Sequence, residues 1–146
     1  MRLSKQTEYG LRAVVQLARI GPRHYAQSRD LSQAESGMPS KYLEAILLTL
    51  RRGGFLESKV GREGGYRLAK SPKEIRIGDL IRRLEGRLTV HEEVVAGEIS
   101  PGEIAVHLLN QKLTEATDDV LDSLTLADLL DQANLAAGLQ QQMYYI

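Results

Sequence analysis

The chain of 146 residues contains no cysteine and no tryptophan, and only one phenylalanine. The absence of cysteine excludes disulfide bonds, cysteine-ligated zinc or iron–sulfur centres and cysteine nucleophiles. No run of about 18 apolar residues is present, so we expect no transmembrane helix. The first residues lack the apolar stretch of a secretory signal, and we expect a cytoplasmic protein.

Motifs of the common enzyme classes are also missing. The sequence has no Gly-x-Ser-x-Gly motif and no phosphate-binding P-loop, and its Ser, His and Asp residues have no spacing that selects a triad. The glycine-rich turn at 61–65 is too short for a dinucleotide fingerprint, and the helix that should follow it is missing. We therefore expect that the chain is not an enzyme.

The net charge of zero hides a separation of charge along the chain. Residues 1–90 hold 18 Lys and Arg and 9 Asp and Glu, whereas residues 91–146 hold 1 and 10. The two segments therefore carry +9 and −9. A basic half of this size favours a nucleic-acid partner for that half.

The basic half has the periodicity of a winged helix-turn-helix. Ser4 is placed to cap a helix that runs to about Ile20. Its predicted buried stripe is Leu11, Val14, Val15 and Ala18. A short helix over about 29–35 follows, with Ser28 as its cap and Leu31 and Ala34 facing inward.

A third helix begins near Pro39 and ends at Gly53, after a turn that contains Gly37. Its predicted buried residues are Leu43, Ile46, Leu47 and Leu50. The runs 55–60 and 66–69 flank the turn at 61–65 and predict a β-hairpin, which after a helix-turn-helix is a wing. A further helix covers about 78–84.

The acidic half begins with a polar loop over 87–102. A long helix over about 103–124 carries a predicted dimerisation face of Leu108, Leu109, Leu113, Ala116, Val120 and Leu124. Thr125 and Asp128 form a capping box that opens a last helix, 126 to about 135. We therefore expect a mainly α fold with a small β-hairpin wing, divided into a DNA-binding domain (1–85) and a dimerisation and signal region (86–146).

The third helix and the wing are the candidate DNA-reading elements. An α-helix fits the major groove, and its first residues reach the base edges. Lys41 can donate to guanine or phosphate, and Glu44 can accept from cytosine N4. Arg62 is placed to enter a minor groove. The predicted DNA-binding residues are Arg2, Ser4, Lys5, Ser40, Lys41, Tyr42, Glu44, Arg51, Lys59, Arg62, Gly64 and Gly65.

Several motifs together resemble the Rrf2 family of winged helix-turn-helix transcriptional regulators. They are Pro39-Ser-Lys-Tyr-Leu-Glu44, the segment 50–56, Gly61-x-x-Gly-Gly-Tyr-x-Leu68 and Ile77-Gly-Asp-Leu-Ile81. The resemblance implies a homodimer, built on the long helix, that binds a pseudo-palindromic DNA operator, usually as a repressor. It also implies that Glu44 and the basic wing determine specificity. Val60 departs from the Arg that some members carry at this position.

The iron–sulfur members of that family bind their cluster through three cysteines after the fourth helix. This chain has none there, so we expect no iron–sulfur cofactor. An alternative metal site would use Glu8, His91 and His107, with Glu8 matching an acidic ligand of some members. The other reading is an acidic, solvated loop with two ordinary histidines.

The C-terminal segments 120–129 and 143–146 resemble the CymR-like branch of cysteine-metabolism repressors. That resemblance implies control of cysteine or sulfur metabolism by cysteine synthase as a protein partner. The predicted contact residues are Tyr144, Tyr145 and Ile146, because a terminal carboxylate on an apolar residue is a good handle for a binding pocket. An apolar tail that packs on its own dimer is the alternative.

Three functions therefore stay open from the sequence. The first is a DNA-binding repressor governed by a partner enzyme. The second is a transcriptional regulator that senses iron through ligands other than cysteine. The third is a winged helix that binds proteins and never DNA.

Overall fold

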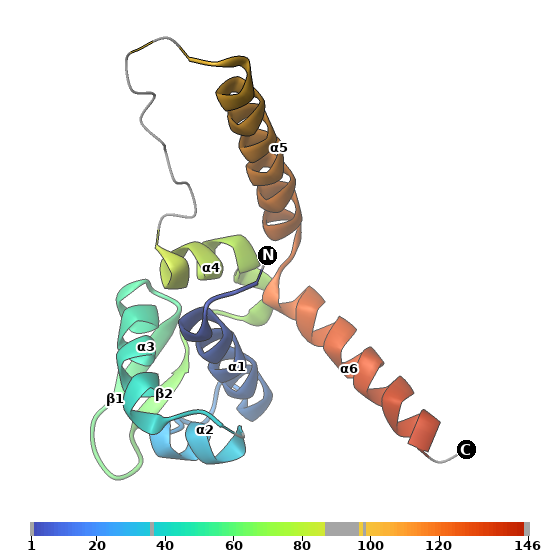
Figure 1. The fold of residues 1–146 in the computed structure, drawn as a ribbon. Coiled ribbons are helices and arrows are strands. Elements are labelled where there is room, and N and C mark those ends of the chain that lie inside the picture. The colour runs from blue at the N-terminus through green and yellow to red at the C-terminus, as the bar shows by residue number, and fades with distance from the viewer. Residues whose placement is uncertain (1, 36, 87–96, 98, 145–146) are drawn as a thin grey trace.

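The computed structural model describes residues 2–35, 37–86, 97 and 99–144. It consists of a compact body, residues 2–86, from which two long helices diverge (Figure 1). None of the helices within these ranges combines the length and apolar character needed to cross a membrane.

Three helices form the centre of the body. They are α1 (Lys5–Ile20), α2 (Ser28–Ala34) and α3 (Ser40–Arg52). The Ser4 hydroxyl caps α1 by accepting a hydrogen bond from the Thr7 backbone N–H at 3.2 Å. The α3 stripe of Leu43, Ile46, Leu47 and Leu50 is buried, as the sequence predicts, and packs with Leu17 and Leu31 in the core.

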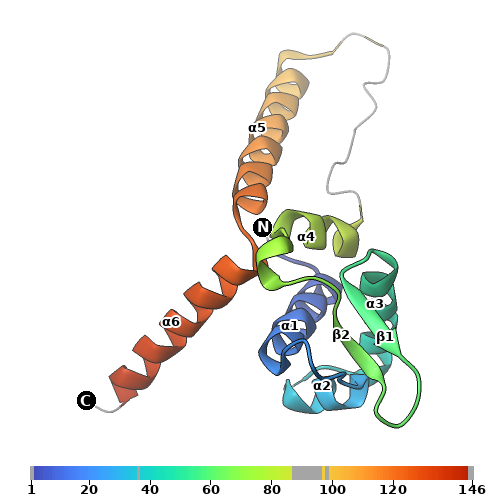
Figure 2. The ribbon, with the colours of Figure 1, turned by 180° about the vertical axis from the view of Figure 1, so that it is seen from behind.

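The wing is an antiparallel hairpin of β1 (Leu56–Lys59) and β2 (Gly65–Leu68), in which Ser58 faces Tyr66. Ala26, just before α2, pairs with Tyr66 through two backbone hydrogen bonds of 2.8 Å. The hairpin is therefore attached through β2 to the segment that leads into α2, and the rear view shows β2 on the side of α1 (Figure 2).

The chain leaves the body after α4 (Ile77–Glu85) and returns to it between its last two helices. A short 3-10 turn, η1 (Pro72–Glu74), precedes α4. The two helices after α4 are α5 (Pro101–Ser123) and α6 (Leu126–Tyr144). The Leu126 backbone N–H donates to Ile75 at 2.8 Å, and the Leu126 side chain is fully buried. The first turns of α6 thereby complete the core, while the rest of that helix points away from the body (Figure 1).

Four details of the sequence prediction need correction. In α1 only Val14 of the expected stripe is fully buried, because Ala13 and Leu17 take the centre of the core and Leu11, Val15 and Ala18 lie at its edge. Ser28 is the first residue of α2, and Gln27 caps the helix.

The other two concern helix ends. Ala34 is exposed, since α2 ends there and Met38 fills the core instead. The last helix runs to Tyr144 rather than 135, because its Ala, Leu and Gln residues are good helix formers.

Candidate nucleic-acid interface

The first turns of α3 present a polar surface to solvent. Ser40, Lys41, Tyr42 and Glu44 are exposed, and the Tyr42 side chain is 67% exposed. Lys41 lies on the side of α3 opposite the buried stripe, and Tyr42 and Glu44 lie on its flanks, because residues off the 3–4 spacing face other sides of a helix. Ser40, three residues before Leu43, is exposed because it is the first residue of the helix. This arrangement leaves donors, an acceptor and an aromatic ring free to meet the edges of bases.

A groove joins this surface to the wing. Its volume is about 340 Å³, and its walls come from the start of α2, from α3 and from the wing turn. The lining residues are Gln27, Ser28, Arg29, Glu44, Gly61, Gly64, Gly65 and Tyr66. Of the predicted DNA contacts, the structure therefore brings Glu44, Gly64 and Gly65 together in one place.

The two wing glycines are required by the fold itself. A Cβ on Gly64 would lie 2.1 Å from the Lys59 carbonyl oxygen, and one on Gly65 would lie 2.3 Å from that of Ala26. Gly65 also has φ +139°, which side chains rarely adopt. These glycines set the shape of the wing, so any contact they make with DNA comes second to this constraint.

The basic residues of the wing have different surroundings. Arg62 and Lys59 are exposed, and Lys59 Nζ lies 5.9 Å from the centre of the Tyr25 ring. Arg67 packs on the same ring at 4.4 Å, pairs with Glu57 and donates to the Pro22 carbonyl oxygen at 3.1 Å. Arg67 thus holds the wing to the α1–α2 loop, whereas Arg62 is presented to solvent at the turn.

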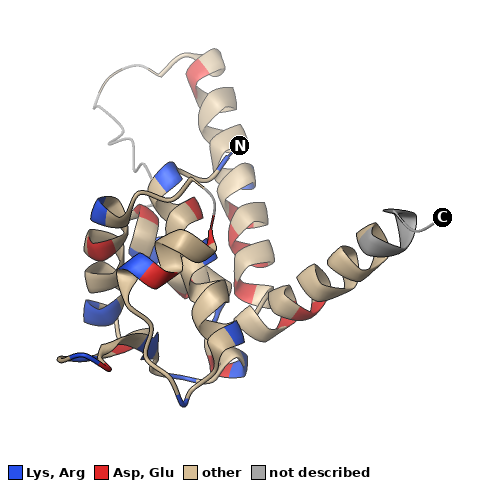
Figure 3. Ribbon diagram, turned by 90° about the horizontal axis from the view of Figure 1, so that it is seen from below, with Lys and Arg blue, Asp and Glu red and all other residues tan. Residues whose placement is uncertain are grey.

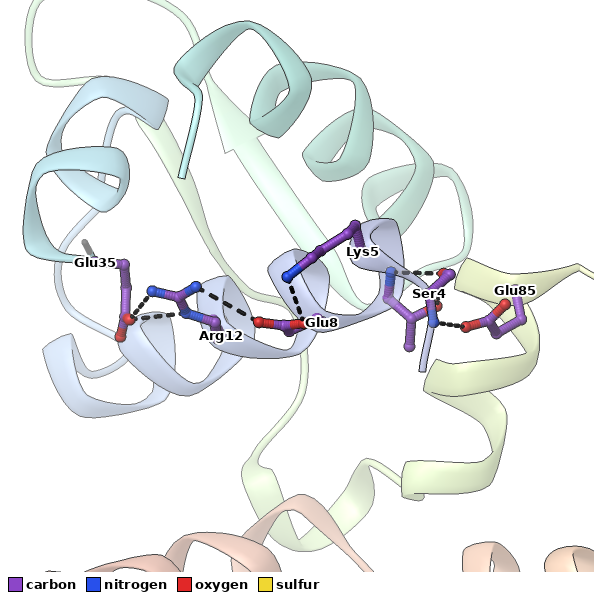
Figure 4. Close-up of polar contacts among 7 residues, drawn as sticks. Ser4, Lys5, Glu8, Arg12, Glu35 and Glu85 are labelled. Carbon is purple, nitrogen blue, oxygen red and sulfur yellow. Dashed lines mark hydrogen bonds and ion pairs between the residues drawn. The ribbon is translucent and has the colours of Figure 1, made fainter. Parts of the chain in front are cut away.

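The remaining predicted contacts lie at the other end of the body. The Ser4 backbone N–H donates to Glu85 at 2.9 Å, which places the start of α1 beside the end of α4 (Figure 4). Arg2 and Lys5 are exposed there, and exposed Arg51 is in the last turn of α3. The wing turn is at the opposite end (Figures 1 and 2). The predicted contacts therefore form two groups. The reading group lies on α3 and the wing and consists of Ser40, Lys41, Tyr42, Glu44, Lys59, Arg62, Gly64 and Gly65. The flanking group consists of Arg2, Ser4, Lys5 and Arg51.

Polar residues at the start and along one face of α1 contact the end of α4 and the residue that follows α2 (Figure 4). Arg12 lies 3.9 Å from Glu8 and 2.9 Å from Glu35, just after α2. A 2.6 Å hydrogen bond from Gln16, supported by Arg12, lowers the pKa of the Glu35 carboxyl. At the other end, hydrogen bonds from the Thr7 hydroxyl and the Ser4 backbone lower the pKa of Glu85.

These contacts bear on the alternative metal site. Glu8 already pairs with Lys5 Nζ at 3.4 Å and lies 3.9 Å from Arg12, which it shares with Glu35. His107 is exposed on α5, and His91 is outside the described residues. Within the described part of the chain, no three His, Cys, Asp or Glu residues are grouped to hold a metal ion.

Charge separates in space as it does in sequence. Lys and Arg are distributed over the helices and wing of the body, whereas α5 and the first turns of α6 carry mostly Asp and Glu (Figure 3). The acidic helices repel the phosphates of a duplex. This field favours approach to the body and disfavours approach to α5.

Arg82 joins α5 to the body through its side chain. Arg82 of α4 donates to Asp122 at 2.8 Å and to Asp118 at 3.1 Å, both on α5. These bonds lower the pKa of Asp122 and raise that of Arg82. The charged side of α5 thus faces α4. Of the predicted dimerisation residues, Leu108, Leu109, Leu113, Ala116 and Val120 are exposed and Leu124 is half-buried at the body.

Sequence reasoning missed the residues that act across the fold. Arg82 is 36 residues from Asp118, and Ser28 is 16 residues from Glu44, to which its hydroxyl donates at 3.0 Å. The spacing of apolar residues along one helix does not predict contacts between polar residues of different helices. The excess of exposed charge on both partner helices is the only signal that could have suggested the first.

The comparisons with known proteins agree with this architecture. Residues 3–132 match the Rrf2 family, described as iron-dependent transcriptional regulators. The HTH-type transcriptional regulator CymR of Bacillus subtilis is 32% identical over 147 residues and all of both chains. NsrR of Geobacillus kaustophilus, also an HTH-type transcriptional regulator, is 35% identical over 97% of this chain and 99% of its own.

Two solved structures are similar over most of their length. The B. subtilis CymR structure has a TM-score of 0.75, 31% identity and coverage of 90% of this chain and 98% of its own. The IscR of T. potens has a TM-score of 0.75, 32% identity and coverage of 93% and 90%. These relatives are regulators and not enzymes, as the sequence predicts. With its winged helix and its match over nearly the whole length, the chain belongs to the Rrf2 family of DNA-binding transcriptional regulators.

Proposed function

We propose that the chain is a homodimeric repressor that binds a pseudo-palindromic operator and responds to a protein partner. Each protomer would insert the first turns of α3 into the major groove and the wing turn into the adjacent minor groove. Ser40, Lys41, Tyr42 and Glu44 read bases in this proposal, Lys59 and Arg62 act from the wing, and Arg2, Lys5 and Arg51 contact flanking phosphates.

The exposed face of α5 carries the proposal of a dimer. Val106, Leu109, Leu113, Ala116 and Val120 are spaced alternately three and four residues apart, which is the a/d pattern of a coiled coil. Their four large side chains are 46–58% exposed. Leu108, which the sequence pattern also suggests, lies about 140° around the helix from Leu113 and outside this seam.

Attachment to the body leaves that seam free. Asp118 and Asp122 point toward Arg82, so the opposite side of α5 faces away from α4. An amphipathic helix of 23 residues with an uncovered apolar face is stabilised by burying that face. A second copy of the same helix supplies a matching face, and twofold symmetry then presents two reading groups to a palindrome.

The double substitution Leu109→Asp and Leu113→Asp tests the dimer. We expect a monomer by size exclusion with light scattering. Because two linked sites bind with avidity, affinity for a two-half-site operator should fall about 100-fold or more, with half-site affinity unchanged. Gln111→Asp, on the other side of α5, is the matched control and should stay dimeric. A double variant that remains a dimer would refute this interface.

We propose that the chain regulates genes of cysteine metabolism and that cysteine synthase is its protein partner. Its support is the likeness to B. subtilis CymR, whose structure is described as that of the global cysteine regulator. The α6 helix extends away from the body as far as Tyr144 (Figure 1). Tyr145 and Ile146 lie outside the described residues, as does the Tyr144 side chain.

Titration with purified cysteine synthase tests this part of the proposal. We expect complex formation, and we expect loss of affinity when Ile146 is deleted. Unchanged affinity would refute capture of the tail. Such a partner acts by binding the DNA-competent and DNA-incompetent dimers with different affinity.

Iron content decides between this partner and direct iron sensing. The sequence holds no cysteine, and oxygen and imidazole ligands are poor for iron–sulfur clusters. We expect protein purified without oxygen to contain far less than one iron per chain. Stoichiometric iron would favour an iron-sensing regulator with ligands other than cysteine.

A further inference from the structure

One three-residue segment touches both DNA-reading elements. Ala26 pairs with Tyr66 of the wing through two backbone hydrogen bonds. The Gln27 side-chain amide donates to the Arg62 carbonyl oxygen in the wing turn at 3.3 Å. The Ser28 hydroxyl donates to Oε1 of Glu44 on α3 at 3.0 Å. Residues 26–28 therefore join the wing to the reading surface of α3.

The hydrogen bond from Ser28 gives the two oxygens of the Glu44 carboxylate different surroundings. A carboxylate only accepts hydrogen bonds, and its two oxygens together offer about four acceptor sites. With Oε1 bound to Ser28, the side chain loses much of its rotational freedom, and Oε2 is left to accept from a base amine. The amines in the major groove are N4 of cytosine and N6 of adenine, while the acceptors of guanine are repelled by the same carboxylate.

We propose that Ser28 is a positioning residue for base selection by Glu44. It makes no base contact itself in this proposal. It orients a carboxylate that faces the groove, whose walls also include the wing turn at Gly61, Gly64 and Gly65. Gln27 fixes the wing turn relative to that carboxylate. This inference rests on the base-reading role proposed for Glu44.

The experiment compares base preference rather than affinity alone. The full-length wild-type chain first selects its preferred duplex from a randomised DNA pool, and binding is then measured to every single-base-pair variant of that duplex. We expect Glu44→Ala to lower selectivity at one base pair of each half-site by about tenfold. We expect Ser28→Ala to lower selectivity at the same base pair by about three- to tenfold, with nonspecific binding and its salt dependence unchanged.

Three further variants separate positioning from a structural role. Ser28→Thr keeps the hydroxyl and should restore selectivity. In the Glu44→Ala background, Ser28→Ala should have no further effect on selectivity. Ser32→Ala is the matched control, because that α2 serine donates instead to the Met38 carbonyl oxygen and should leave base preference intact.

The outcomes are distinguishable. If Glu44→Ala lowers binding equally to all duplexes, the role of Glu44 is wrong and the inference falls with it. If Glu44→Ala changes selectivity but Ser28→Ala reduces binding evenly, Ser28 is structural and only this inference is overturned. A selectivity change from Ser28→Ala that persists without Glu44 would also overturn it.

Discussion

The body and α5 have the same apolar periodicity, but it leads to burial within the chain only in the body. In the body, the 3–4 spaced leucines of α3 are all buried within one chain, with Leu47 fully inaccessible. In α5, Leu113 has the same spacing from its neighbours and is 46% exposed. Periodicity therefore shows that a face is to be buried, but not whether the same chain or another one covers it.

The largest effect should come from truncating equivalent leucines in these two regions. Leu47→Ala leaves a cavity in the core and should lower the free energy of unfolding by about 2–5 kcal/mol. Leu113→Ala should act through dimer dissociation, so its effect should depend on protein concentration. Urea unfolding at two protein concentrations measures both. An equal loss from Leu113→Ala in fully dissociated protein would mean that α5 is stabilised within its own chain.

The opposite charges of the two regions predict a smaller difference in DNA binding. Arg62→Ala removes an exposed wing cation and should lower the slope of log affinity against log salt by about one. Lys112→Ala removes an exposed cation from α5 and should leave the slope unchanged. Fluorescence anisotropy over a salt series measures both variants. Equal changes in slope would place DNA on the acidic helix as well.

Acid should weaken the body by a modest amount. The pKa values of Glu35 and Glu85 are lowered from 4.5 in the folded chain, so the unfolded chain binds more protons in this range. Stability is therefore present above about pH 4.5 and is lost as pH falls through the folded-state values. Urea unfolding from about pH 7 to 3.5 should show this decline.

Glu35→Gln should flatten part of that pH dependence. Glu103→Gln, at the start of α5, should leave the dependence of the body unchanged, although the Glu103 pKa is also lowered, by its capping contacts with Ser100. A full decline that persists in Glu35→Gln would assign the acid sensitivity to other groups.

Local signals in the sequence predict most of the body. Pro39 and Gly53 mark the ends of α3, and four apolar residues between them define its buried side, so both follow from neighbours in the chain. The exposure of Ala34 could not be predicted, because it depends on Met38 filling the core from a turn. The sequence predicts that the last helix ends near 135, but α6 continues through Gly138 to Tyr144, because its Ala, Leu and Gln residues are good helix formers.

The candidate site, like the body, is only partly predictable from local patterns in the sequence. The exposed residues of α3 follow from its buried stripe, and Arg62 follows from its place in a turn. The Ser28–Glu44 hydrogen bond and the Arg82–Asp122 pair depend on how separate helices meet, which local patterns do not encode. The split between reading and flanking groups has the same origin.

The return of the chain to the core at Leu126 makes α5 a lever. Its 23 residues span about 34 Å. The helix meets the body at its last turns, where Arg82 donates hydrogen bonds to Asp118 and Asp122. A tilt of about 6° at that joint displaces the far end of such a helix by about 3.5 Å relative to the body. Because α5 carries the proposed dimer contacts, the same tilt changes the relative position of the two α3 helices on a palindrome. A signal that shifts this joint slightly can thus release the operator while leaving the fold of the body intact.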